Sequence, residues 1–127
     1  MTYKILIVDD SKLARMSVAK VLNALEPEWT RLEAANADEA VALFESEHPD
    51  VVLMDFNMPG RDGLELASEL HKLDPKIPLG VISANIQIEI VEKTRAIGAQ
   101  FLAKPLTEEA FSGFIKIAKS QLEGTTL

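Results

Sequence analysis

Short apolar runs alternate along this chain with stretches in which apolar residues recur at helical spacing. The runs have few polar interruptions, which is typical of strands buried on both faces of a parallel sheet. Five runs predict strands, at residues 3–8, 30–35, 51–55, 77–82 and 100–103. The second run alternates polar and apolar positions, so we expect it near an edge of the sheet.

A helical pattern follows each run. In the first, apolar residues at positions i, i+4, i+7, i+8 and i+11 form one stripe of an amphipathic helix: Ala14, Val18, Val21, Leu22 and Leu25. The pattern predicts helices from residue 12 to Pro27, from 37 to Pro49, over 64–73, over 86–97, and from 108 onward. The expected caps are Ser11 or Asp10, Asn36, Gly98 and Thr107. The last helix carries its core residues at Phe111, Phe114, Ile115, Ala118 and Leu122.

Strands that alternate with helices indicate an α/β fold, a single-domain (βα)5 parallel sheet with right-handed crossovers. A chain of 127 residues has room for one core. We therefore expect one domain over residues 1–122 and a short C-terminal tail over 123–127.

Composition narrows the classes of function. The chain has no cysteine, which excludes disulfides, thiolate metal sites and cysteine nucleophiles. Its 13 basic and 20 acidic residues give a net charge of −7, with no basic patch, which disfavours nucleic acid and anionic membranes as partners. Neither a signal peptide nor an apolar stretch of the ~20 residues that a bilayer requires is evident. We expect a cytoplasmic protein.

Candidate chemistry lies where the predicted strands end. Asp9 and Asp10 follow the first strand, Asp55 ends the third, Ser83 the fourth and Lys104 the fifth. Taken singly, each has a structural explanation as a helix cap, a loop hydroxyl or a surface charge. The carboxyl ends of parallel strands share one edge of a sheet, so we expect these groups to converge.

Three converging carboxylates repel one another by roughly 1 to 4 kcal/mol per pair, so the cluster favours a bound cation. Oxygen ligands without His or Cys suit Mg²⁺. A hydroxyl and an ammonium group beside that ion would supply what a phosphoryl group needs.

These motifs carry a resemblance to a known family. Asp9-Asp10, the stretch from Leu53 through Asp55 to Gly63, Ser83-Ala84 and Lys104-Pro105 resemble the receiver domain of response regulators in two-component and phosphorelay signalling, the CheY-like family. The resemblance covers about residues 4–122. It implies a doubly wound, flavodoxin-like sheet with strand order 2-1-3-4-5, which is the order found in CheY itself.

The resemblance also implies roles for these residues. Asp55 would be the nucleophile that takes a phosphoryl group from a phosphohistidine to give an aspartyl phosphate. Mg²⁺ would be held by Asp10, Asp55, the backbone carbonyl of Asn57 and, through water, Asp9. Lys104 would pair with the phosphoryl oxygens.

Two further positions are implied to transmit the signal. Ser83 stands where the family has Ser or Thr, and its hydroxyl would move to the phosphoryl group. Phe101 occupies the switch aromatic position and would act through packing alone, because it has no hydroxyl. The peptide bond between Lys104 and Pro105 is expected to be cis.

The predicted partners follow from the same resemblance. The donor would be a sensor histidine kinase or a histidine phosphotransfer protein. We expect no effector domain after residue 122, so a separate effector would read the signal. Helical projection predicts an effector face at Ile88, Ala110, Gly113 and Ile117, and a donor face at Met16 and Ala19. We expect a monomer or weak dimer that catalyses only its own phosphorylation and dephosphorylation.

Other interpretations of the sequence remain open. The domain could be a relay intermediate that passes its phosphoryl group on. A magnesium-dependent phosphohydrolase of the haloacid-dehalogenase type would also use a strand-end aspartate, but Asn57 cannot serve as its acid/base. In a flavodoxin-like redox protein Asp9-Asp10 would repel the flavin phosphate.

Overall fold

The computed structural model describes residues 2–124, and its elements alternate strand and helix as predicted. The strands are β1 (Lys4–Val8), β2 (Thr30–Ala34), β3 (Val51–Asp55), β4 (Leu79–Ser83) and β5 (Gln100–Ala103). The helices are α1 (Lys12–Leu25), α2 (Ala37–Glu47), α3 (Gly63–Leu73), α4 (Ile88–Ala96) and α5 (Glu108–Glu123).

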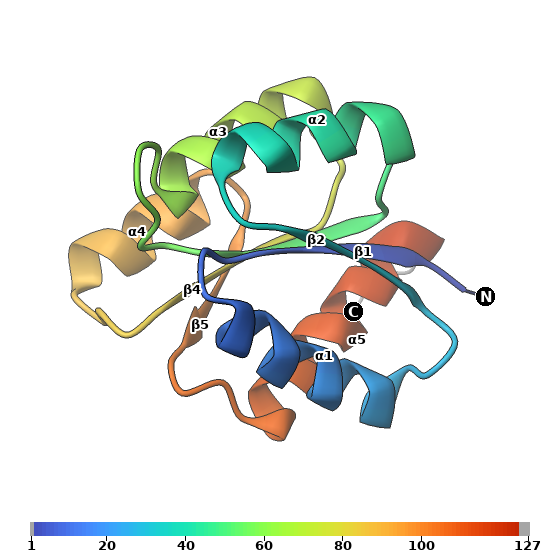
Figure 1. Cartoon of the computed structure of the whole chain (residues 1–127). Coiled ribbons are helices and arrows are strands. Elements are labelled where there is room, and N and C mark those ends of the chain that lie inside the picture. Colours follow the sequence, from blue (N-terminus) through green and yellow to red (C-terminus); the bar gives the residue numbers. More distant parts are fainter. Residues whose placement is uncertain (1, 125–127) are drawn as a thin grey trace.

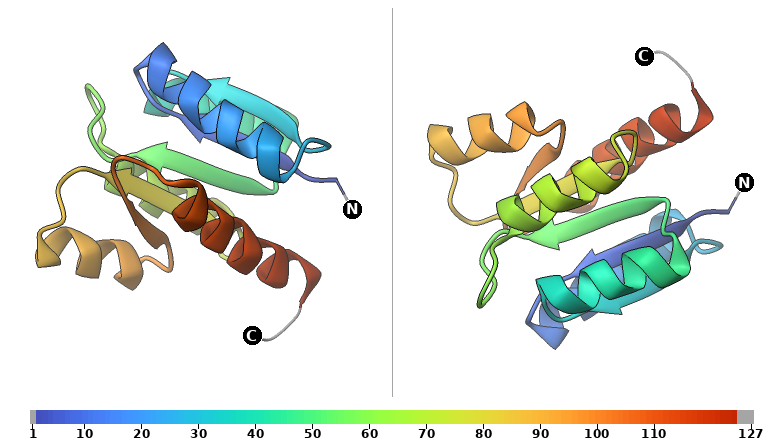
Figure 2. Two further views of the ribbon diagram at one scale, coloured as in Figure 1. Left: turned by 90° about the horizontal axis from the view of Figure 1, so that it is seen from below. Right: turned by 90° about the horizontal axis from the view of Figure 1, so that it is seen from above.

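The five strands form one parallel sheet in the order β2-β1-β3-β4-β5, which confirms the implied topology. Helices α2 and α3 cover one face and α1 and α5 the other, while α4 lies beside β5 (Figure 1). The connections that leave β1, β3 and β4 at their carboxyl ends all lie at the left of Figure 1. In Figure 2, α1 and α5 lie in front of the sheet in the view from below, and α2 and α3 lie in front of it in the view from above.

β3 is the centre of the sheet, and all five of its residues are buried. Successive strand side chains point to opposite faces. Leu6, Val52 and Met54 therefore pack under α2 and α3, whereas Ile7 and Leu53 pack under α1 and α5. The β3 run is apolar throughout because both of its faces meet a helix layer.

Side-chain caps fix where four of the five helices begin. Ser11, Asn36, Asp62 and Thr107 each accept a hydrogen bond from the backbone N–H three residues on, and Asp62 forms a reciprocal capping box with Glu65. α4 has no side-chain cap, and Thr94 is its one buried residue. α4 is therefore the helix least anchored to the core.

Two predicted boundaries are wrong. The fourth strand begins at Leu79 and not at residue 77, because Pro78 has no N–H for the ladder and offers its carbonyl to Val52 instead (3.1 Å). The fourth helix begins at Ile88 and not at residue 86, because the Asn85 side chain accepts from the N–H of Gln87 and holds a turn.

Smaller differences occur at other ends. The first strand starts at Lys4, the second ends at Ala34, and the third helix starts at Gly63. Glu123, predicted to open a frayed tail, is the last residue of α5, and the tail beyond Gly124 lies outside the described residues. Within residues 2–124, no helix combines the length and the apolar character that a bilayer crossing requires.

Candidate functional site

Three carboxylates meet at the carboxyl edge of the sheet. Asp9 and Asp10 come directly after β1, and Asp55 is the last residue of its neighbour β3. Each offers an oxygen, and these oxygens lie within 4.8 Å of one another. Asp9 and Asp55 are buried, whereas Asp10 is exposed, so the cluster opens to solvent on one side.

Lys104 brings a positive charge to this cluster. Its Nζ lies 2.8 Å from Oδ1 of Asp55 and 3.8 Å from Oδ2 of Asp9. The backbone N–H of Lys104 donates to the carbonyl of Ser83 at 3.0 Å, which extends the β4–β5 pairing to the residue that carries the ammonium group. The bond between Lys104 and Pro105 is cis, as expected.

The charges at the site shift two pKa values. Burial raises the pKa of Asp55 above its ordinary value; the hydrogen bond from Lys104 opposes this rise, and the charges of Asp9 and Asp10 add to it. Burial acts to lower the pKa of Lys104, but its hydrogen bond to Asp55 and the nearby carboxylates outweigh burial and raise it. Lys104 is therefore held as a cation beside a carboxylate that is costly to ionise.

A hydroxyl group lies at the next strand end. Ser83 is buried at the end of β4, and its Oγ accepts a hydrogen bond from the N–H of Asn85 at 3.0 Å. Register pairs Ser83 with Ala103, the residue before Lys104. Asn57 lies in the loop after β3, and the half-buried Phe101 lies in β5.

Gly63 allows the loop after β3 to return close to the strand. Its N–H donates to the carbonyl of Phe56 at 2.9 Å. A Cβ added at Gly63 would lie 2.8 Å from the Cα of Phe56 and would also collide with the backbone oxygen of Asp55. Glycine is therefore required for the close approach that packs this loop against Asp55.

The donor set fits a divalent cation. Among residues 2–124, Lys104 is the one ammonium group within salt-bridge distance of this cluster, and it reaches Asp9 and Asp55 but not Asp10, which leaves uncompensated negative charge. Carboxylate oxygens open to water on one side suit Mg²⁺, which keeps several of its own waters. Asp9, Asp10 and Asp55 are the side chains that could hold it.

The predicted partner residues fall into two groups. Met16, Ile88, Ala110, Gly113 and Ile117 are exposed, as a docking role requires. Ala19 is buried, with 8% of its surface exposed, so its placement off the core face is wrong. α1 packs against both the sheet and α5, and this second contact buries a wider arc of the helix than one stripe predicts.

Two arginines near the site were missed from the sequence. Arg15 donates to the backbone carbonyl of Asp9, and Arg61 pairs with Glu69 and with Asp38 (3.1 Å), which ties the loop after β3 to α3 and α2. An arginine one turn into a helix can reach back toward the preceding strand, because helical side chains point toward the N-terminus. That geometry is the signal that could have identified Arg15.

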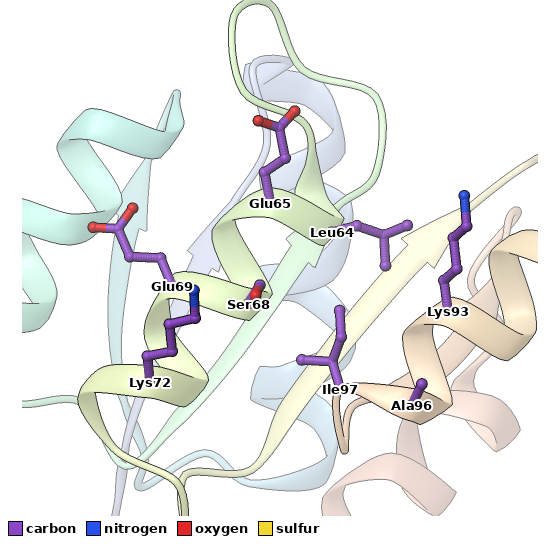
Figure 3. Close-up of a pocket in the computed structure, with 8 residues that line it drawn as sticks. All are labelled: Leu64, Glu65, Ser68, Glu69, Lys72, Lys93, Ala96 and Ile97. Carbon is purple, nitrogen blue, oxygen red and sulfur yellow. The ribbon is translucent and has the colours of Figure 1, made fainter.

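A groove on another part of the surface does not share this chemistry. It measures about 610 Å³ and lies between α3 and α4, where Leu64 and Ile97 point into the space between the helices (Figure 3). The acidic residues that line this groove form contacts within the chain: Glu65 completes the capping box of α3, and Glu69 pairs with Arg61. A smaller hollow of about 340 Å³, between α1 and the segment after β5, does reach Asp9 and Lys104.

The chain is similar to known proteins. The family model for the response regulator receiver domain matches residues 5–116. The sporulation initiation phosphotransferase F of Bacillus subtilis is 30% identical over 117 residues, which cover 91% of this chain and 93% of that protein. The transcriptional regulatory protein PdtaR of Mycobacterium tuberculosis is 37% identical over 97% of this chain, which spans only 60% of that protein's length.

A solved structure agrees with them. The CheX–CheY complex with BeF₃ and Mg²⁺ from Borrelia burgdorferi matches with a TM-score of 0.84 and 25% identity, covering 92% of this chain and 89% of that one.

Proposed function

Because this chain belongs to the response regulator receiver family, we propose that it accepts a phosphoryl group on Asp55 and so switches its binding to a partner. The observation that carries the proposal is the contact of Lys104 with Asp55 at 2.8 Å beside a further pair of carboxylates. The donor would be a sensor histidine kinase or a histidine phosphotransfer protein. Receiver domains are signalling modules, and the one reaction proposed here is the domain's own phosphorylation and its reversal.

Several residues of the chain would each have a separate role in phosphoryl transfer. An oxygen of the Asp55 carboxylate attacks phosphorus, the P–N bond to the donor imidazole breaks, and its electron pair leaves with the imidazole. Lys104 moves its hydrogen bond from the carboxylate to the phosphoryl oxygens and offsets their charge. Mg²⁺ held by Asp9, Asp10 and Asp55, with the backbone carbonyl of Asn57, would supply further compensating charge.

We propose that Ser83 and Phe101 carry the signal away from Asp55. In the unphosphorylated chain the Ser83 hydroxyl oxygen accepts a hydrogen bond from the N–H of Asn85. A phosphoryl oxygen on Asp55 would accept a hydrogen bond from the Ser83 hydroxyl proton, and movement of Ser83 toward it would free space into which the half-buried Phe101 can turn. If Phe101→Ala leaves both phosphorylation and effector binding unchanged, the aromatic ring has no part in the switch.

The effector face would lie on α4 and α5. Ile88 is 71% exposed and Ile117 is 37% exposed, and Ala110 and Gly113 add small exposed residues on α5. α4 has one buried residue and no side-chain cap, so little free energy holds it in one position. A weakly anchored helix is suited to respond to a small change at the adjacent β4 end.

Two fates of the phosphoryl group fit this site. It can switch a separate effector, or it can pass to another histidine. The name of the relative sporulation initiation phosphotransferase F indicates transfer of a phosphoryl group by that protein. The structure of the CheX–CheY complex shows that a chain of this fold binds another protein. We propose the first role for this chain, in the cytoplasm, and the relay role as the alternative.

Acceptance on Asp55 is tested by intact-mass measurement. The full chain is incubated with a small phosphodonor, with and without Mg²⁺. We expect one phosphoryl group to be gained only with Mg²⁺, and no gain in Asp55→Asn. Asp74→Asn, which changes an exposed aspartate after α3, is the matched control and should behave as wild type. Modification of Asp55→Asn at the wild-type rate would refute the assignment.

The donor face is tested with two donors. Met16 is 55% exposed on α1, close in sequence to Asp10. Met16→Asp should slow transfer from a histidine phosphotransfer protein but leave the reaction with a small phosphodonor unchanged. Ile88→Asp, an equal change on the proposed effector face, should leave both rates unchanged. Equal transfer from the protein donor to wild type and Met16→Asp would count against a docking role for α1.

A further inference from the structure

One ion pair lies directly against the turn that carries Asp9 and Asp10. Arg15 donates from Nη1 to the backbone carbonyl oxygen of Asp9 at 2.6 Å and from Nε to Oε1 of Glu33 at 2.9 Å. Glu33 belongs to the edge strand β2. The guanidinium group therefore connects the end of β1 both to its own helix and to the neighbouring strand.

This ion pair is more enclosed than an ordinary surface pair. The Arg15 side chain is only 15% exposed, and Arg31 holds the second oxygen of Glu33 at 3.1 Å. Burial tends to raise the pKa of Glu33, but the hydrogen bonds and charges of Arg15 and Arg31 outweigh it and lower the pKa. Exposed pairs are worth little, whereas an enclosed guanidinium needs good partners to offset its desolvation. The geometry of Arg15 is therefore well determined.

Other contacts hold Asp9 in place, whereas the direction of the Asp10 side chain depends on the orientation of the backbone. The N–H of Asp9 donates to the carbonyl of Ala34 at 3.1 Å, and its side chain accepts from the N–H of Ser11 at 2.9 Å. Within residues 2–124, no hydrogen bond or ion pair is formed by the Asp10 carboxylate. The carbonyl that Arg15 holds belongs to the peptide between Asp9 and Asp10, so its orientation sets the direction of Asp10.

We propose that Arg15 is a positioning residue for the metal site: it fixes the Asp9–Asp10 peptide so that both carboxylates face Asp55, and Glu33 in turn fixes Arg15. The inference rests on the proposed function, because it concerns the Mg²⁺ that these carboxylates would hold. Arg15 itself touches neither the metal nor the phosphoryl group in this role.

Charge and position predict opposite results when Arg15 is replaced. Arg15→Met removes a cation beside three carboxylates, so on charge alone Mg²⁺ would bind more tightly. Loss of the hydrogen bond to the Asp9 carbonyl frees the Asp9–Asp10 peptide. If Arg15 acts by positioning the two carboxylates, Mg²⁺ should therefore bind more weakly. Removing a group that orients metal ligands typically weakens metal binding 10–100-fold.

The test is calorimetric titration of Mg²⁺ into the metal-free full chain. We expect Arg15→Met to raise the Kd about tenfold. Lys20→Met removes the same charge from an exposed position of α1 and should bind as wild type does. An unchanged or lower Kd for Arg15→Met overturns the inference and leaves the proposed function standing. A wild-type chain that binds no Mg²⁺ refutes the metal site and the inference together.

A second pair of variants covers a failure of Arg15→Met to fold, which circular dichroism would reveal. Glu33→Gln should weaken Mg²⁺ binding several-fold, whereas Arg31→Gln, which contacts Glu33 but not the turn, should have less effect. Where Arg15→Met does fold, Glu33→Gln should add nothing in its background, because it acts through Arg15. A Glu33→Gln effect that disappears at high salt would indicate long-range charge and would contradict the positioning role.

Discussion

Asp55→Asn should make the metal-free protein more stable at neutral pH. The substitution keeps the shape of the side chain but removes a charge that is 4% exposed and lies among other carboxylates. The amide oxygen can still accept a hydrogen bond from Lys104. The change therefore isolates the free energy cost of ionising Asp55 in the folded state.

The size of the effect follows from the distances. At an effective dielectric constant of about 20, each repulsion across at most 4.8 Å costs at least about 3.5 kcal/mol, and the attraction of Lys104 at 2.8 Å contributes about 6 kcal/mol of stabilisation. Two repulsions exceed the one attraction by about 1 kcal/mol, and burial of the charge adds to the cost. We expect Asp55→Asn to raise the free energy of unfolding by about 1–2 kcal/mol.

The pH dependence has a definite sign. Because the pKa of Asp55 is raised on folding, the folded chain binds a proton more tightly than the unfolded chain does. Wild-type stability therefore falls as the pH rises from the ordinary range of an aspartate through the raised pKa. The advantage of Asp55→Asn should be full above that window and should disappear below it.

Urea denaturation with a chelator, at neutral and acidic pH, measures both quantities. Glu45→Gln, which removes an exposed charge that forms no ion pair within residues 2–124, is the control and should change stability by less than about 0.5 kcal/mol. Adding Mg²⁺ should stabilise wild type more than Asp55→Asn. A variant less stable than wild type at neutral pH would show that pairing with Lys104 dominates. An advantage that persists in acid would show that the gain does not come from the charge of Asp55.

Three further substitutions test the local reasoning, each by urea denaturation. Gly63→Ala should destabilise the fold by about 2–3 kcal/mol and slow phosphorylation, because its Cβ meets the backbone of Asp55 and Phe56; normal stability would contradict this. Asp62→Ala should cost about 1 kcal/mol through loss of the α3 cap, and a neutral result would show that the capping box is dispensable. Gly113→Ala, whose Cβ would meet nothing within 4 Å, should stabilise α5 by up to about 1 kcal/mol, and a loss would indicate a contact not seen in this structure.

Much of the fold could be predicted because it depends on local patterns. The third strand was predicted with its observed bounds, since a run that is buried on both faces has no polar alternation. Caps such as Asn36 and Thr107 were predicted because a side chain and a backbone N–H three residues apart suffice to form them. The errors occur where contacts with other elements determine the structure. The carbonyl of Pro78 accepts a hydrogen bond from β3, which sets the start of the fourth strand. Ala19 is buried by helix packing that one helical stripe does not describe.

Which chemical groups stand at the strand ends follows from the order of the amino acids, because parallel strands bring their carboxyl ends to one edge whatever the details of packing. How these groups are held depends on tertiary contacts. These contacts bring the three carboxylates within 4.8 Å, set Lys104 against Asp55, and place Arg15 between Asp9 and Glu33. Arg15 and Glu33 are far apart in the chain, and their contact depends on the pairing of β1 with β2 and the packing of α1, which no local pattern encodes.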